Sequence, residues 1–243
     1  MTESGEQGEL QEQQGALGAV AGVLTGPERA FASLARRPRW WLPLLLVTAL
    51  AVSLSVVVTP RLDMRSIVRE SLEKRGVEVS AEQLEQQLEI AEKFGWIGSL
   101  TQVVIQPVVI LLVAAVFLAF LRLLGSDLDL KQSLAVASHG FLPMSVAALL
   151  SFPVVLSRES LSLAEVRAGG FLKSNLAFLA PEGTGAGLVS FLGSIDLFSL
   201  WAVALFAIGY RVVGRVSAAQ AWGCVVGLWA AYVFGKAALA AIF

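Results

Sequence analysis

The sequence predicts an all-α, polytopic integral membrane protein, a bundle of five transmembrane helices. Hydrophobic residues make up 56% of the 243 residues and charged residues only 15%, whereas ordinary soluble domains are about 45–50% apolar and about 25% charged. Five continuous apolar segments also reach the length of about 17–25 residues that a helix needs to cross a bilayer. A transmembrane barrel is not expected, because its strands alternate apolar and polar residues.

The chain is expected to begin with a polar tail followed by a basic helix. Residues 1–22 form the acidic, Gln-rich tail and are predicted to be disordered. Residues 23–39 carry a helix-start signal at Gly26-Pro27, and Phe31 and Leu34 fall on one helical face among several arginines. This pattern predicts an amphipathic helix lying on the membrane surface, with a solvated basic linker as the alternative.

Residues 40–243 are predicted to form the membrane domain. Four arginines precede its first span, and the positive-inside rule therefore places the N-terminus in the cytoplasm. An odd number of crossings then puts the C-terminus outside. Pro107 is expected to kink the second span. The predicted spans are residues 40–58, 97–124, 134–156, 187–213 and 218–243.

A further helix is predicted in the long loop between the first two spans. Ser80 and Gln83 fit a capping box at its start, and Gly95 is expected to end it. The helix carries an apolar stripe that either packs on the rest of the protein or docks another protein. The stripe consists of Leu84, Leu88, Ala91 and Phe94.

The last span carries small residues at every fourth position. Such a pattern, with Gly-x-x-x-Gly at its centre, is typical of closely packed membrane helices. The face is predicted either to pack within the chain or to form a homodimer contact. It consists of Ala219, Gly223, Gly227, Ala231 and Gly235.

Asp196 lies inside the fourth predicted span, where a carboxylate at the helix centre costs roughly 2.5–3.5 kcal/mol. Three interpretations are open. The helix could start near Ile195 and leave the carboxylate at the membrane rim, where the helix dipole favours it. The carboxylate could instead be buried and accept hydrogen bonds from a Ser, Thr or His of a neighbouring span, with His139 as the first candidate. It could also belong to an ion or proton path.

Other polar residues in the spans are candidates for function beside Asp196. Gln106, His139 and Asp196 together could form a polar pocket, although their spacing alone does not require it. Ser194 and Ser199 flank Asp196 and complete the set of candidate polar residues.

Several functional classes are not expected. The sequence has no nucleophile motif, HExxH, P-loop or usable carboxylate pair, so we predict no enzyme and no cofactor. With one Cys and one His, a zinc site is not expected. The net charge of −1 gives no attraction to nucleic acid.

Four stretches stand out by their order and spacing, and together they resemble the bacterial branch of the Yip family, the Ypt/Rab-interacting membrane proteins. The resemblance implies a five-span membrane domain with a cytosolic N-terminus, here in a bacterial cytoplasmic (inner) membrane. Rab binding, which it implies for eukaryotic relatives, is not carried over, because the short N-terminal region lacks their Asp-Leu-Tyr-Gly-Pro motif. The stretches are Gly26-Pro27 to Trp41, residues 80–95, Ser138 to Pro143, and Ser194 to Trp201 with Ala207 to Tyr210.

The sequence thus predicts a non-enzymatic membrane scaffold or organiser that binds other membrane proteins or lipids. Its expected partners are the lipid bilayer, other membrane proteins and a second copy of itself. The alternative is a small transporter or channel component with a polar path around Asp196, His139 and Gln106.

Overall fold

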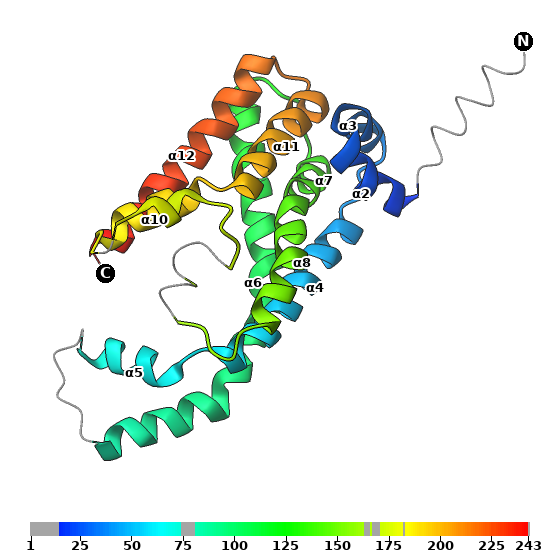
Figure 1. Ribbon diagram of the computed structural model, residues 1–243. Helices are drawn as coiled ribbons and strands as arrows, with labels where there is room; N and C mark the ends of the chain where they lie inside the picture. Colours follow the sequence, from blue (N-terminus) through cyan, green and yellow to red (C-terminus); the bar gives the residue numbers. More distant parts are fainter. Residues whose placement is uncertain (1–14, 74–80, 163–165, 167–170, 182, 243) are drawn as a thin grey trace, which may run out of the picture. The chain divides into compact units, whose positions relative to one another are not determined.

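A computed structural model describes residues 15–73, 81–162, 166, 171–181 and 183–242, and these residues form helices joined by loops (Figure 1). Five helical segments are long and apolar enough to cross a membrane. The predicted polytopic, all-helical fold is therefore confirmed. The five segments are α4 (Trp41–Val58) with the short helix η1 (Thr59–Arg61), α6 (Ala81–Leu123), α7 (Leu130–Gly140) with α8 (Leu142–Leu156), α11 (Leu197–Gly214) and α12 (Ala218–Ile242).

Two short helices precede the first span, which corrects the predicted tail. Helix α2 (Ala16–Thr25) begins inside residues 1–22, and its Ala19 and Val23 are buried. Its sequence is apolar from Ala16 onward, so burial against the protein stabilises it. Residues 1–14, the acidic part of the predicted tail, lie outside the described residues.

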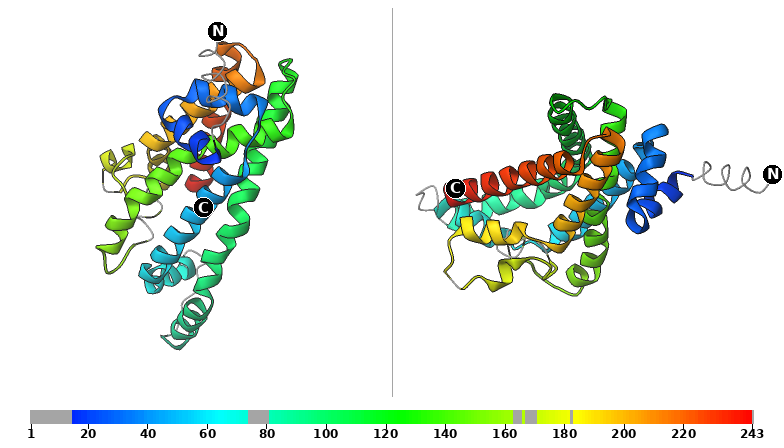
Figure 2. Two further views of the ribbon diagram at one scale, coloured as in Figure 1. Left: turned by 90° about the vertical axis from the view of Figure 1, so that its right-hand side faces the viewer. Right: turned by 90° about the horizontal axis from the view of Figure 1, so that it is seen from above.

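The predicted basic helix is present as α3 (Pro27–Arg36), with Pro27 at its first turn. Its apolar face does not face the bilayer, however, because Phe31 and Leu34 are buried in the hydrophobic core of the protein. Helix α3 packs on α2 and α7 (Figure 2). The Gln132 side chain of α7 also donates a hydrogen bond to the Ala35 carbonyl (3.0 Å). The apolar face of α3 therefore packs within the protein, against α7 and α11, and the position of this helix at the membrane surface stays a prediction.

The helix predicted in the first long loop is the first part of a longer helix. Helix α6 runs unbroken for 43 residues through both Gly95 and Pro107, so Gly95 does not end it. One glycine costs a helix only about 1 kcal/mol, and apolar residues follow it directly. The kink expected at Pro107 stays a prediction, and Ser80 lies outside the described residues.

The fourth predicted span, residues 187–213, is not continuous. Helix α10 (Ala186–Ser194) ends before Ile195, and α11 starts at Leu197. A second segment pairs with the chain at this break, because Asn175 and Asp196 form an isolated antiparallel bridge. The third span is likewise two helices, α7 and α8, which meet at Phe141. Phe141 lies inside the polar and Pro-containing stretch Ser138–Pro143, which the sequence indicates as an interruption of this span.

The chain forms two compact units, which we describe separately. Unit 1 comprises residues 1–47, 107–146 and 198–233, and unit 2 comprises residues 48–106, 147–197 and 234–243. The centre of unit 1 is aromatic: the Phe117 ring centroid lies 5.5 Å from that of Phe206 and 4.6 Å from that of Tyr210. Helices α5 (Met64–Glu73), α10 and η2 (Leu176–Leu179) belong to unit 2.

Candidate functional site

Asp196 lies in the break before α11 and is 9% exposed. Its carboxylate accepts a short hydrogen bond from the Ser174 hydroxyl. The backbone joins the same two segments, because Leu197 N–H donates to the Ser174 carbonyl (3.0 Å) and Leu176 N–H donates to the Ile195 carbonyl (3.2 Å). The buried carboxylate is therefore part of a junction between the 174–176 segment and the start of α11.

This geometry contains a part of the first interpretation, the helix start, and a part of the second, the buried carboxylate that accepts a hydrogen bond, with Ser174 in place of His139 as the donor. The helix begins one residue after it, so the carboxylate stands at the positive end of the helix dipole, where it is stabilised. Its depth in the membrane stays a prediction.

Ser194, the residue that ends α10, takes part in a second contact network of unit 2. Its hydroxyl donates to the Ser190 carbonyl (2.8 Å) and accepts from the Lys236 ammonium (3.4 Å). A side-chain carbon added at Gly187 would lie 2.8 Å from Ala241 Cβ. Helix α10 thus packs tightly against the end of α12, and Ser194 has a structural partner there; Ser199 is half-buried in the first turn of α11.

His139 is fully buried in unit 1. Its Nδ1 is hydrogen-bonded to the Ala135 carbonyl of its own helix (2.8 Å), and its Nε2 is buried without a hydrogen-bond partner among the described residues. The hydrogen bonding of His139 is therefore within its own helix, and the prediction that it pairs with Asp196 is not supported.

Gln106 is half-buried in α6. Because Gln106 and Asp196 belong to unit 2 and His139 to unit 1, a pocket of the three stays a prediction.

Unit 1 contains a polar centre that is not among the predicted sites. The Ser133 hydroxyl donates to the Ala114 carbonyl (2.7 Å) and lies 3.2 Å from the Tyr210 hydroxyl. The Ser126 hydroxyl donates to the Gly214 carbonyl (2.6 Å). These bonds join α6, α7 and α11, as side-chain hydrogen bonds between membrane helices do. A polar residue inside an apolar span was the available signal, but serine is common in membrane helices.

The small-residue face of α12 is open. Its members, Ala219, Gly223, Gly227, Ala231 and Gly235, are all exposed, and a side-chain carbon added at any of the three glycines would meet nothing within 4 Å. The alternative of close packing within the chain is therefore wrong for the described residues. A contact with a second copy stays a prediction.

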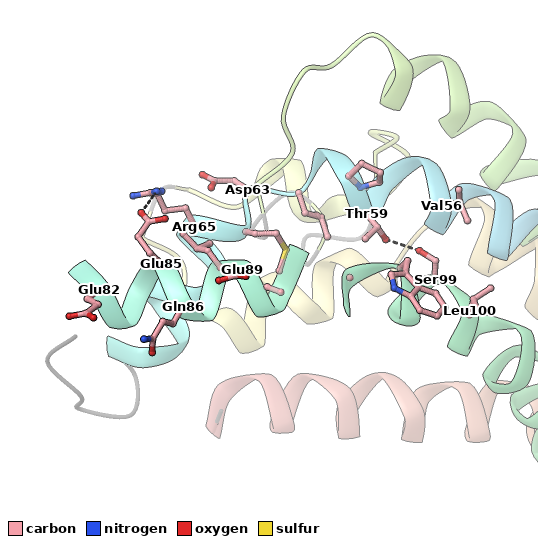
Figure 3. Close-up of a pocket in the computed structure, with 17 residues that line it drawn as sticks. Val56, Thr59, Asp63, Arg65, Glu82, Glu85, Gln86, Glu89, Ser99 and Leu100 are labelled. Carbon is pink, nitrogen blue, oxygen red and sulfur yellow. Dashed lines mark hydrogen bonds and ion pairs between the residues drawn. The ribbon is translucent and has the colours of Figure 1, made fainter. Parts of the chain in front are cut away.

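The apolar residues predicted to form a stripe on the loop helix differ in their exposure. Leu88 is 8% exposed and Phe94 is 51% exposed, while Leu84 and Ala91 are half-buried. Leu88 and Ala91 line an open groove of unit 2, which has a volume of about 960 Å³ (Figure 3). We call it the loop groove; its walls are the end of α4 with η1, the start of α5, and residues 82–100 of α6.

Polar contacts hold the walls of the loop groove together. The Arg65 guanidinium of α5 forms an ion pair with Glu85 of α6 (2.6 Å). The Ser99 hydroxyl of α6 lies 2.9 Å from the Thr59 hydroxyl (Figure 3). Leu161 N–H donates to the Arg61 carbonyl (2.7 Å), which fastens the same segment from the other side. The loop groove is therefore preformed.

Comparison with known proteins identifies the class of membrane protein. The Yip1 domain family model matches residues 21–239. The chain is also 27% identical over 206 residues to the membrane protein YknW of Bacillus subtilis (strain 168), an alignment that covers 83% of this chain and 80% of that protein. No solved structure matches the chain.

Proposed function

The chain belongs to the Yip1 domain family of membrane proteins, and from this premise we propose that it is a non-enzymatic scaffold that binds other membrane proteins. The loop groove is the single observation that carries the proposal. It is large, open and preformed, and it has an apolar floor with polar sides, which suits the amphipathic segments that proteins exchange.

The proposed location is a bacterial cytoplasmic membrane with the N-terminus inside. Arg29, Arg36 and Arg37 precede α4, and cations beside the first span favour the cytoplasmic side. Because α4 crosses between these arginines and the loop groove, the groove belongs to the opposite, outer side. Cysteine labelling in a Cys224→Ser background, at the exposed positions Asp127 and Glu159, tests this arrangement, and labelling of position 127 from outside would contradict it.

The contacts of Asp196 favour this scaffold over a transporter. Its carboxylate is engaged by Ser174 at the start of a helix, which is a structural use of a buried charge. Asp196→Asn retains an oxygen acceptor for Ser174, so we expect assembly with the partner to survive this change. Complete loss of function with unchanged folding would instead favour a proton- or cation-coupled path.

The experiment that tests the scaffold is site-specific photocrosslinking of the full chain in its native host. A photoreactive residue at Gln86, an exposed position of the loop groove, is expected to capture a membrane protein. The same residue at Asp127, exposed in unit 1, is the control. Capture should disappear when Ala91→Trp fills the groove floor. Equal capture from both positions, or capture unaffected by Ala91→Trp, would contradict the proposal.

A further inference from the structure

We propose that the occupant of the loop groove is a basic amphipathic helix of a partner protein. This inference rests on the proposed scaffold function and adds the chemistry of the partner.

The first argument is the charge of the groove. Four carboxylates line it against one guanidinium, a net formal charge of −3; the five groups are Asp63, Glu82, Glu85, Glu89 and Arg65.

The guanidinium of Arg65 is already paired with Glu85. Glu82 and Glu89 make no ion pair or hydrogen bond with the described residues and are exposed. Two carboxylates are therefore left to receive cations from a ligand.

Two cations near the groove, Arg61 and Lys93, do not line it. Arg61 donates to the Val57 carbonyl of its own helix (2.8 Å). The Lys93 ammonium lies 6.0 Å from the centre of the Phe94 ring, and neither Lys93 nor Phe94 lines the groove. Among the described residues that line the groove, carboxylates therefore outnumber cations, and such a surface attracts cations.

The second argument is the arrangement of charge beside apolar surface. Glu82, Glu85 and Glu89 follow helical spacing along one edge of α6, over a length of about 10 Å (Figure 3). Leu88 and Ala91 lie on the adjacent edge and form the apolar floor. A helix with lysines or arginines at i, i+3 and i+7 beside a leucine stripe is complementary to both edges.

Two other occupants fit less well. Carboxylates repel the phosphates of anionic lipids, so such a headgroup is disfavoured. In the proposed topology, α4 crosses the membrane between the basic helix of this chain, α3, and the segments that form the loop groove. With that topology, a second copy of the same orientation presents α3 on the opposite side of the membrane from the groove.

The test uses the full chain in nanodiscs of zwitterionic phosphatidylcholine. Two synthetic helices share one leucine face and differ only in a lysine or glutamate polar face, and fluorescence anisotropy measures their binding above that of empty nanodiscs. We expect the lysine helix to bind and the glutamate helix to bind at least about tenfold more weakly. Raising the salt concentration should weaken the lysine helix, because exposed charges are screened.

Matched variants locate the site. The double variant Glu82→Gln with Glu89→Gln leaves the Arg65–Glu85 pair intact and should weaken the lysine helix roughly two- to thirty-fold, the range for two exposed ion pairs. The control, Asp127→Asn with Glu159→Gln, removes two charges that do not line the groove and should leave binding unchanged. Ala91→Trp, with unchanged helix content, should abolish binding by filling the floor.

Equal binding of the two helices, or equal effects of the two double variants, would overturn the inference. Photocrosslinking from Gln86 separates it from the proposed function. If that position captures a membrane protein but the lysine helix does not bind, the partner chemistry is wrong and the scaffold stands. Capture of lipid alone or of a second copy overturns the inference, and loss of all capture from the groove overturns both.

Discussion

Helices α11 and α12 are consecutive and equally apolar, because the mean hydropathy of an 18-residue stretch is 1.7 in both. In α11, however, 56% of that stretch is buried, and in α12 only 11%. Their glycines differ in the same way. A side-chain carbon at Gly209 of α11 would lie 2.7 Å from Val136 Cγ1, whereas one at Gly223 or Gly227 of α12 would meet nothing within 4 Å. The repeated small-residue motif thus lies on the exposed face of α12, whereas the close helix contact is made at a single glycine of α11, Gly209.

The largest difference between the two helices is expected from Phe31→Ala, because Phe31 of α3 packs against α11. Phe31 is fully buried, and its ring faces Gly209, so its removal should lower the free energy of unfolding by about 3–5 kcal/mol. Thermal unfolding of the full chain in detergent measures the loss. Tyr232→Ala on α12, at a side chain 65% exposed, is the aromatic control and should stay within about 0.5 kcal/mol. Similar losses would contradict the contrast.

The next effect is a change of opposite sign at two glycines. Gly209→Ala places its new carbon against Val136 and the Phe31 ring at 2.7 and 2.9 Å, and overpacking of this kind costs about 1–3 kcal/mol. Gly223→Ala adds a carbon to open space and removes a poor helix former, so it should stabilise the helix by up to about 1 kcal/mol. The unfolding midpoints of the two variants are compared with that of the unchanged protein. A lower midpoint for Gly223→Ala would contradict the expected sign and indicate a contact to this face of α12 in the detergent-solubilised protein.

The starts of the two helices provide a third comparison. Asp196→Ala removes the carboxylate before α11 and leaves the Ser174 hydroxyl without this acceptor, which should cost about 2 kcal/mol. At the start of α12 the Ser217 hydroxyl accepts from Gln220 N–H (3.2 Å) at an exposed site, and Ser217→Ala should cost about 1 kcal/mol or less. Chemical denaturation of both variants compares them, and a larger loss at Ser217 would reverse the expected ranking.

The smallest effect concerns one buried hydroxyl. Tyr210→Phe deletes the group that lies 3.2 Å from the Ser133 hydroxyl but keeps the aromatic stack, so we expect a loss of about 1 kcal/mol. Tyr232→Phe on the exposed face of α12 should change nothing measurable. The difference between the two thermal midpoints is the quantity to compare, and indistinguishable midpoints would mean that the Ser133–Tyr210 contact contributes little.

Much of the fold is readable from local sequence. Hydropathy and length predict the five spans, Gly26-Pro27 predicts the start of α3, and the polar and Pro-containing stretch Ser138–Pro143 predicts the break between α7 and α8. These features depend on residues close together in the chain. Gly95 was misleading as a helix end, because the apolar residues that follow it continue the helix.

The candidate sites were less readable. The sequence drew attention to Asp196 and to the carboxylate-bearing loop helix, and both lie at structured positions. The role of Ser174 beside Asp196 was not visible, because 22 residues separate the two. Likewise, nothing local places Arg65 against Glu85 to form a wall of the loop groove.

The sequence by itself determined that the chain is a five-span helical membrane protein of the Yip type, because apolar length and motif order are properties of the chain. Only the tertiary structure decided which faces are used. It buried the apolar side of α3 inside the protein, left the glycine face of α12 open, and placed Asp196 at a helix start joined to a distant loop. The physical reason is competition: an apolar or small-residue face packs on whichever complementary surface the fold brings to it, and that surface comes from residues far away in sequence.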